Sequence, residues 1–502
     1  MDSAKLRAKV SALALVAALA TGPALVASPA LARSAPDGFA DLIADVSPAV
    51  VQITVRQSAS AGSPETGPRA EIPEQFRDGP FRDFFERFFQ EGVPGPHSGQ
   101  RPGPRAERGA LGSGFIVSAD GLVVTNNHVI GEAEKMEVTL KDGSRFPAKL
   151  VGSDEKTDLA LLKIDANRPL PTLKWGDSDA TRVGDWVVAV GNPFGLSGTA
   201  TAGIVSSRGR DLGAGPYDDF IQIDAPINTG NSGGPLFDGD GKVIGINTAI
   251  YSPNGGSIGI GFAIPSNAAQ KVVAELQEHG SVRRGWLGVA IQPVTPDVAE
   301  SLNLKKAEGA LVASVSAGSP AAKGGVRQGD VVLGFDGKPV TSPRELSRAV
   351  ADAEVGEKGK LVVWRDGREV KLDVLLGEMP TQTATTEGAR GVPDAAPARG
   401  GVALSALGLT LAPLDDGTRA RFGVAAGTKG AVVAAVDGGG DAEEKGLQPG
   451  DVITRVNQDS VSTPADVAGA VERAKSANRK SVLLLIERGG TQQFVAVDLK
   501  SA

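Results

Sequence analysis

The chain has 502 residues, which is too long for a single hydrophobic core and suggests about three domains. It contains 66 glycines but only 16 Phe, 4 Trp and 2 Tyr, a composition that favours turn-rich β structure over helical bundles. The formal net charge of -7 argues against a nucleic-acid partner, and a sequence without cysteine has no disulfide, zinc–thiolate site or thiol nucleophile. With three histidines and no HExxH pattern, we expect neither a metal nor a cofactor.

The N-terminal segment is typical of a signal peptide. Three basic residues within 1–9 precede a small-residue apolar stretch at 10–20, and Ala30-Leu31-Ala32 offers an A-x-A cleavage site. An uncleaved membrane anchor is the alternative, but the short apolar stretch and two later prolines disfavour it. We therefore expect residues 1–32 to be removed and the chain to be exported to a periplasm, where a fold without disulfides is tolerated.

Residues 34–57 predict a short helix followed by a strand, since spaced apolar residues give way to a continuous apolar run at 50–55. A long loop rich in Gly, Pro, Arg and Glu follows at 58–110. It holds six phenylalanines within 76–89. They could form a helix packed on the same subunit, or a segment that docks on a neighbouring subunit or covers a cleft.

From 111 to 265 short β-like runs alternate with Gly, Asn and Asp turns, which is typical of antiparallel barrels. The clearest runs lie at 114–117, 122–125, 159–164, 186–190 and 243–246. Residues 266–279 then predict a helix capped by Ser266.

An internal repeat covers the rest of the chain. Gly-Ala-Leu-Val at 309–312 matches Gly-Ala-Val-Val at 430–433, and Gly-Asp-Val-Val at 329–332 matches Gly-Asp-Val-Ile at 450–453, at one offset of 121 residues. An offset this large indicates duplicated domains rather than solenoid units. Residues 379–401 between the copies are rich in Pro, Ala, Thr and Gly and predict a flexible linker.

Three motifs in the β-rich region carry candidate catalytic residues. His128 lies in Thr-Asn-Asn-His-Val, Asp158 in Thr-Asp-Leu-Ala, and Ser232 in Gly-Asn-Ser-Gly-Gly-Pro. Acyl transfer needs an oxygen nucleophile, a base that takes its proton and an acid that orients the base, roles that suit Ser232, His128 and Asp158. The backbone N–H groups of Gly230 and Ser232 can converge as an oxyanion hole. The chain order His, Asp, Ser is that of chymotrypsin-type enzymes.

Each residue alone has an ordinary structural explanation. His128 could be a core residue and Asp158 a turn residue, whereas the Gly-Asn-Ser-Gly-Gly-Pro motif before a strand is much more specific. The other two histidines, His97 in the loop and His279 at a helix end, are expected at the surface.

These motifs resemble those of the HtrA (Do-like) family of serine endopeptidases, over roughly residues 38–500. Further matching segments lie at 112–117, 191–195 and 259–266. The resemblance implies a mainly β chain: a chymotrypsin-like double β-barrel protease domain followed by two PDZ domains, which are α+β, partly open β-barrels. The expected bounds are 33–280 for the protease domain, 281–378 and 402–500 for the PDZ domains.

The resemblance also implies an activity and partners. It implies ATP-independent cleavage of misfolded or damaged exported proteins, chaperone behaviour, and assembly into a homotrimer or higher homo-oligomer. Peripheral membrane association is left open. Two residues depart from the family pattern before the Gly-Asn-Ser, namely Pro226 and Thr229. A binding protein or chaperone with little proteolysis is therefore the rival hypothesis, and an esterase is a weaker third.

Two sets of substrate-binding residues follow from the resemblance. Residues 248–262 would wall the specificity pocket, where Tyr251, Ile258 and Ile260 suggest an apolar site for a small aliphatic side chain. In the first PDZ domain the loop of Trp286, Leu287, Gly288 and Val289 would receive a peptide C-terminus on its backbone N–H groups. The corresponding loop of the second is at 406–409. We expect peptide binding more of the first copy, because the second has a polar segment at 437–441.

Overall fold

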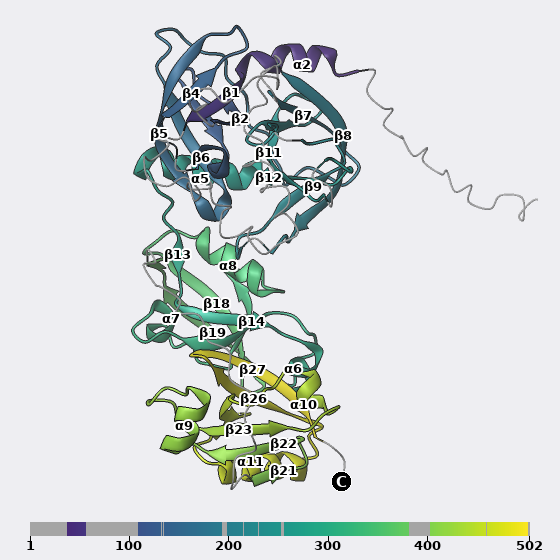
Figure 1. Cartoon of the computed structure of the whole chain (residues 1–502), viewed down its shortest axis with the longest axis vertical. Helices are drawn as coiled ribbons and strands as arrows, with labels where there is room; N and C mark the ends of the chain where they lie inside the picture. The colour runs from purple at the N-terminus through teal and green to yellow at the C-terminus, as the bar shows by residue number, and fades with distance from the viewer. Residues whose placement is uncertain are drawn as a thin grey trace, which may run out of the picture.

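The structure is a computed structural model of the whole chain. It describes residues 38–56, 109–131, 133, 135–192, 198–213, 215–228, 230–252, 256–380, 402–457 and 459–499. The predicted signal peptide, the phenylalanine cluster at 76–89, His97 and Thr229 lie outside these residues, as does most of the linker at 379–401. Three bodies are stacked along the long axis of the molecule: two barrels at one end, then the first and the second repeat (Figure 1).

The N-terminal prediction of a helix and a strand is confirmed. Helix α2 (Ala40–Val46) leads through the 3₁₀ turn η1 (Ser47–Ala49) into β1 (Val50–Arg56). Phe39 before the helix packs on Trp186 of the second barrel, with ring centroids 5.9 Å apart. The N-terminal helix α2 is thereby attached to the second barrel, whereas β1, the strand that follows it, belongs to the first barrel.

The first barrel closes in the strand order β1-β2-β3-β6-β5-β4. Its other strands are β2 (Gly109–Ile116), β3 (Leu122–Thr125), β4 (Lys135–Thr139), β5 (Arg145–Asp154) and β6 (Leu159–Ile164). Two short elements lie at strand ends, α4 (Asn127–Ile130) after β3 and η3 (Glu155–Thr157) before β6. All of β3 is buried. This agrees with its mainly apolar sequence, because side chains fill the interior of a small barrel.

The second barrel closes in the order β10-β11-β12-β9-β8-β7. Its strands are β7 (Trp186–Gly191), β8 (Thr199–Arg210), β9 (Phe220–Ile223), β10 (Pro235–Phe237), β11 (Val243–Ile250) and β12 (Gly261–Pro265). One continuous cluster of buried apolar side chains runs through both barrels, so they form a single domain, and the motifs that hold His128, Asp158 and Ser232 meet where the barrels join.

Helix α5 (Ser266–His279) has the predicted bounds and packs across β5, β6 and β11. The predicted serine cap is wrong. Strand β12 runs directly into the helix, so Pro265 occupies the cap position, and no side chain caps it. Ser266 is already helical, and its hydroxyl donates instead to the carbonyl of Gly176 at 2.8 Å. None of the helices within the described ranges is long and apolar enough to cross a membrane.

Each repeat is built on one large antiparallel sheet with covering helices, and in the first repeat β13 and β20 pair as a separate two-stranded sheet. The first contains β13 (Gly285–Trp286), β14 (Val289–Pro293), α6 (Pro296–Ser301), β15 (Ala310–Val315), α7 (Pro320–Lys323), β16 (Val331–Phe335), β17 (Lys338–Pro339), α8 (Pro343–Ala351), β18 (Lys358–Arg365), β19 (Arg368–Leu375) and β20 (Gly377–Glu378). The second contains β21 (Val402–Leu404), β22 (Leu409–Pro413), α9 (Asp416–Phe422), β23 (Ala431–Val436), α10 (Asp441–Glu444), β24 (Val452–Val456), β25 (Asp459–Ser460), α11 (Pro464–Ser476), β26 (Ser481–Arg488) and β27 (Thr491–Asp498).

The matched Gly-Asp segments have the same role in both repeats. Asp330 and Asp451 are each 1% exposed at the start of a central strand. Asp330 binds the guanidinium of Arg365 at 2.7 Å, and Asp451 binds that of Arg488 at 2.5 and 2.7 Å. A buried carboxylate needs such a partner, so the repeated motif maintains the turn into the strand.

Two junctions join the three bodies. Between the barrels and the first repeat, charged pairs include Arg284 with Asp154, Arg348 with Asp219, and Arg344 with Asp211. Between the two repeats the contact is mainly an apolar cluster. Its buried members are Val294, Val298, Ala299, Leu311, Val331, Leu483, Leu485, Phe494 and Ala496.

Candidate active site

The predicted base and acid are in direct contact. His128, 1% exposed in α4, places its ring Nδ1 2.7 Å from Oδ2 of Asp158. The other carboxylate oxygen of Asp158 accepts the backbone N–H of His128 at 2.9 Å. One carboxylate therefore sets both the backbone position and the ring orientation of the histidine. Because Asp158 binds Nδ1, the proton of a nucleophile would have to go to Nε2.

The backbone of Asp158 adopts an unusual conformation that its neighbours support. It is left-handed, with φ 55° and ψ 41°, a region that Asp tolerates better than most residues. The preceding turn η3 is capped by Asp154, whose carboxylate accepts the N–H of Thr157 at 3.0 Å. The side-chain amide of Asn126 donates to the carbonyl of Asp158 at 2.8 Å. These bonds hold the carboxylate toward His128.

Ser232 lies at the same junction of the barrels and is fully buried. Its hydroxyl donates to the carbonyl of Thr248 in β11 at 3.3 Å, a long hydrogen bond that is weak by geometry. The hydroxyl of the same Thr248 donates to Oδ2 of Asp158 at 2.7 Å. Thr248 thus touches two of the three candidate residues. The sequence analysis placed this position only at the start of the predicted pocket wall at 248–262, and it did not predict the contacts with Asp158 and Ser232.

The loop around Ser232 is fixed to the first barrel. The hydroxyl of Ser113 in β2 donates to the carbonyl of Gly230 at 2.5 Å, and its N–H donates to the carbonyl of Ser232 at 2.9 Å. Gly233 has φ +83°, and a Cβ there would lie 2.2 Å from the Ser113 carbonyl, so no larger residue fits. Gly230 also has a positive φ, 97°. The predicted oxyanion residues thus lie on a tightly constrained turn.

The residues predicted for the specificity pocket lie at the ends of β11 and β12. Tyr251 and Ile258 are exposed, whereas Ile260 is half-buried against the core of the two barrels. The N–H of Tyr251 donates to the carbonyl of Ile260 at 3.0 Å, which places these two residues side by side. Their role in substrate binding stays a prediction.

The loop predicted to receive peptides in the first repeat has one buried anchor. Leu287 is 3% exposed within that repeat's core, and Trp286 and Val289 are half-buried. Gly288 has φ +78°, and a Cβ there would lie 2.4 Å from Ser319. The loop therefore turns sharply at Gly288 before β14 begins.

A buried ion pair lies next to the turn that precedes the candidate acid, Asp158. Arg284, where the first repeat begins, binds both carboxylate oxygens of Asp154 at 2.9 and 2.6 Å, and both side chains are less than a tenth exposed. The guanidinium also stacks over Tyr217, 4.8 Å from its ring centroid. Burial raises the pKa of the Tyr217 phenol, which therefore stays neutral. Sequence reasoning did not find this cluster either.

Comparisons with known proteins agree with this architecture. Residues 112–246 match the trypsin-like peptidase domain, and residues 285–376 and 405–499 each match the PDZ domain. A protein of Brucella suis named probable periplasmic serine endoprotease DegP-like is 46% identical over 474 residues, covering 92% of this chain and 90% of that protein. One of the same name from Rhizobium meliloti is 44% identical over 480 residues, covering 93% and 92%.

Solved structures lead to the same family. The HtrA-type protease AlgW with a decapeptide is 41% identical, with a TM-score of 0.54, and covers 69% of this chain and 100% of its own. AlgW with a tripeptide gives a TM-score of 0.55 at 40% identity, covering 69% and 98%. The predicted double barrel followed by two PDZ domains is thus confirmed. The chain belongs to the HtrA family of DegP-like serine endopeptidases.

Proposed function

We propose that Ser232, His128 and Asp158 are the catalytic triad of this endopeptidase. The observation that carries the proposal is the double contact of Asp158 with the ring and backbone of His128, buried at the barrel junction and linked through Thr248 to the Ser232 hydroxyl. Burial strengthens such charge-assisted bonds.

In the proposed reaction Ser232 Oγ attacks the carbonyl carbon of a peptide bond while Nε2 of His128 takes its proton. Asp158 stabilises the imidazolium that forms. The N–H groups of Gly230 and Ser232 receive the oxyanion. When the carbon–nitrogen bond breaks, His128 returns the proton to the leaving amine. Water, activated by His128, then hydrolyses the acyl-enzyme and restores the Ser232 hydroxyl.

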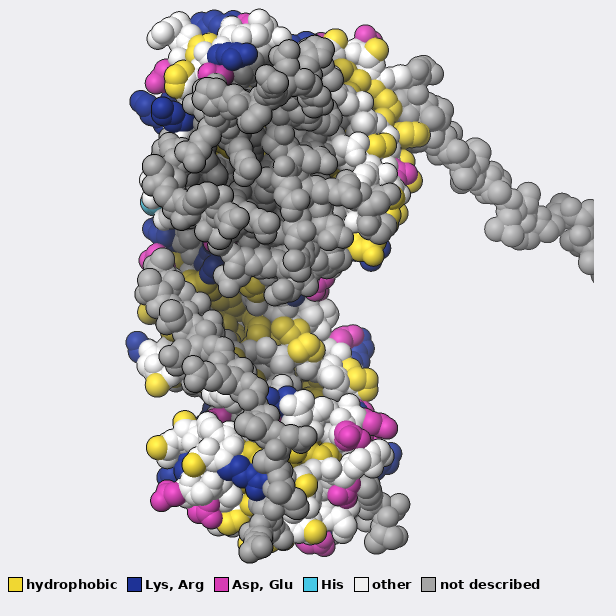
Figure 2. Space-filling view, in the orientation of Figure 1, with side chains coloured by type: hydrophobic (Ala, Val, Ile, Leu, Met, Phe, Trp, Pro, Cys, Tyr) yellow, Lys and Arg dark blue, Asp and Glu magenta, His cyan; other side chains and the backbone are white. Residues whose placement is uncertain are grey.

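The proposed substrates are misfolded or damaged exported proteins. The curated relatives are named periplasmic, and the signal-peptide pattern at 1–32 supports export to the same compartment. The first PDZ domain would tether substrate C-termini at residues 286–289. Supporting observations are the peptides in the AlgW structures and the hydrophobic side chains that gather on the visible face of this domain, next to the protease (Figure 2).

Three further features belong to the same proposal. The domain bounds are 33–280, 281–378 and 402–500, with Tyr251, Ile258 and Ile260 lining the specificity pocket. The working form is a homotrimer or larger assembly. Binding of unfolded chains without cleavage would give chaperone activity.

The test compares the purified chain with Ser232→Ala on casein. Loss of the nucleophile is expected to lower the cleavage rate by at least about 10⁴-fold. Ser207→Ala in β8, a half-buried serine outside the site, is the matched control and should cleave normally. Equal cleavage by the Ser232 variant would show that the nucleophile is wrong. If neither chain cleaves but both suppress aggregation of an unfolding client, the binding-protein hypothesis replaces this one.

A further inference from the structure

The two PDZ domains differ in how their corresponding edge strands are paired. In the first, β14 pairs with β15 on one side and lies at the end of the sheet among the described residues. In the second, the corresponding strand β22 pairs with β23 on one side and with β21 on the other. A PDZ domain binds a peptide by letting it add as a strand to this edge. In the second domain, residues 402–404 of the same chain already pair with this edge.

Strand β21 lies as a bound peptide would. It runs antiparallel to β22, with Val402 opposite Leu411 and Leu404 opposite Leu409. It also contacts α11, the counterpart of the helix α8 that contacts β14 in the first domain. Strand β21 therefore lies against both elements that define a peptide groove.

The end of β21 meets the loop that would hold a terminal carboxylate. The carbonyl of Leu404 accepts the N–H of Leu407 at 2.9 Å. Leu407 and Gly408 are the counterparts of Leu287 and Gly288: both glycines have positive φ, and their carbonyls accept equivalent bonds, from Asp437 at 2.8 Å and from Ser316 at 2.9 Å. Leu404 is therefore placed where a ligand's last residue would be.

The side chain of Leu404 strengthens the resemblance to a bound ligand. It is 7% exposed and belongs to the core cluster of the second domain together with Leu409, Val467 and Val471. Ala403 and Val402 are exposed. Apolar burial of one leucine, on a strand joined to β22 by a four-residue turn, is enough to reduce the apparent affinity of a competing peptide about tenfold to 100-fold.

We propose that β21 is a built-in ligand of the second PDZ domain, with Leu404 in the position of the C-terminal residue. Each chain then offers external peptides one groove, that of the first domain. The second domain acts as a brace through its apolar contact with the first. This inference rests on the proposed function only in naming the first domain as the peptide receiver.

Hydrogen exchange read by mass spectrometry tests the proposal on the full chain carrying Ser232→Ala. The probe is a synthetic peptide copying residues 395–404, which ends in Leu404 with a free carboxylate. In the otherwise unchanged chain, amides at 409–413 should exchange slowly and ignore the probe. Faster exchange there that slows when the probe is added would overturn the proposal.

Two variants release β21 by different routes. Val402→Pro removes the N–H of a residue that pairs with Leu411, at an exposed position and without leaving a core cavity, and Leu404→Asp disfavours burial. Both should speed exchange at 409–413 at least about tenfold, and the probe should restore protection. Val402→Ala keeps the pairing and is the matched control. Protection at 481–488 shows that the domain is still folded. Folded, released variants that gain no probe binding would contradict the inference.

A disulfide supplies the opposite test. Since the chain has no cysteine, Ala403→Cys with Thr410→Cys, on directly opposed positions, can form only one bridge. The oxidised form should not bind the probe at 409–413, and binding there would refute self-occupation. A peptide with an apolar C-terminus, read separately at 287–293, tests the first domain. If that segment does not respond while 409–413 behaves as expected, peptide tethering fails and self-occupation stands.

Discussion

The two junctions of the molecule are held together by different kinds of contact. The protease domain and the first PDZ domain meet mainly through ion pairs: Arg284 with Asp154, Arg344 with Asp211, and Arg348 with Asp219. The two PDZ domains meet through buried valines, leucines and Phe494, with charged pairs such as Lys480 with Glu300 at the exposed margin. The free energy that an ion pair contributes depends on salt concentration and geometry, whereas that of an apolar contact depends on the surface area it buries.

The difference indicates which parts of the chain move together. Gln292 in the first PDZ domain exchanges two hydrogen bonds with the backbone of Phe494 in the second, at 2.9 and 2.7 Å, so the apolar contact also has a fixed register. The PDZ pair should therefore behave as one rigid arm. At the other junction, among the described residues, both members of the Arg284–Asp154 pair are buried, whereas the pairs of Arg344 and Arg348 are at least partly exposed. The arm should hinge on the protease domain around this one buried pair.

The largest expected effect comes from removing that pair. Arg284→Ala leaves the Asp154 carboxylate buried without its cation, which should cost about 3–5 kcal/mol of junction and domain stability. Because Asp154 also caps the turn before Asp158, casein cleavage should fall as well. Thermal unfolding and initial rates measure the two effects.

A second substitution separates charge from packing in this prediction. Adding Asp154→Asn removes the buried charge while keeping an acceptor for Thr157, so it should recover part of the lost stability. Lys271→Ala, which breaks an exposed pair with Asp352 at the same junction, is the control and should change little. An Arg284→Ala chain as stable as the control would contradict the idea of a buried anchor.

The apolar junction should give the next largest effect. Phe494→Ala deletes a ring that is 5% exposed and should weaken the contact between the PDZ domains by about 3 kcal/mol. Amide exchange in α6, which packs on β26 and β27, should speed up. Phe422→Ala, in a separate cluster within the second domain, should destabilise that domain without exposing α6. Slow exchange in α6 of the Phe494 variant would mean that the PDZ pair does not depend on this cluster.

The sequence predicted the strands, the repeat and the motifs of the candidate site, because each of these depends on residues that are close together in the chain. The runs at 122–125 and 159–164 are β3 and β6 as expected, and one offset aligns β15 with β23 and α8 with α11. His128, Asp158 and Ser232 were found because their flanking residues form specific motifs. The family and its architecture followed from those motifs.

The missed features depend on contacts between distant parts of the chain. Thr248 reaches Asp158 across 90 residues, and Arg284 reaches Asp154 across 130. Neither residue type is unusual in its own segment, so no local signal marks it. Strand β21 was hidden for a related reason, because residues 402–404 directly follow a stretch whose composition predicts a linker. Only the pairing with β22 shows what they do.

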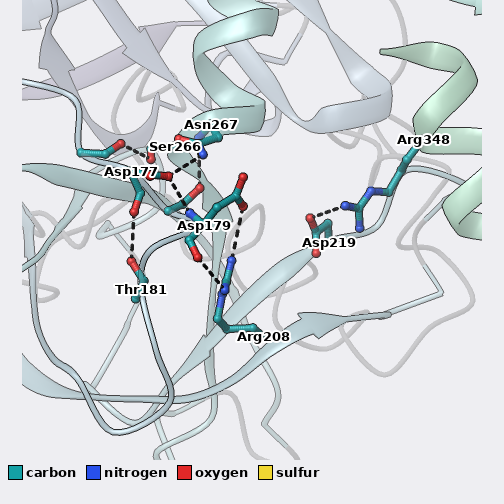
Figure 3. Close-up of polar contacts among 10 residues, drawn as sticks. Asp177, Asp179, Thr181, Arg208, Asp219, Ser266, Asn267 and Arg348 are labelled. Carbon is teal, nitrogen blue, oxygen red and sulfur yellow. Dashed lines mark hydrogen bonds and ion pairs between the residues drawn. The ribbon is translucent and has the colours of Figure 1, made fainter. Parts of the chain in front are cut away.

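The smallest expected effect concerns the exposed pair of Arg348 and Asp219. Figure 3 shows Arg348 reaching from α8 to Asp219, apart from the Asp177, Asp179, Arg208 and Asn267 contacts at the base of α5. The ion pair, 2.9 Å long, is about one third exposed, so a double-mutant cycle of Arg348→Ala and Asp219→Ala should give a coupling of only ~0.2–1 kcal/mol. The coupling should shrink as salt is raised, because exposed charges are screened. A coupling that is large and insensitive to salt would show that the charged junction is as rigid as the apolar one, and the arm would then have no hinge.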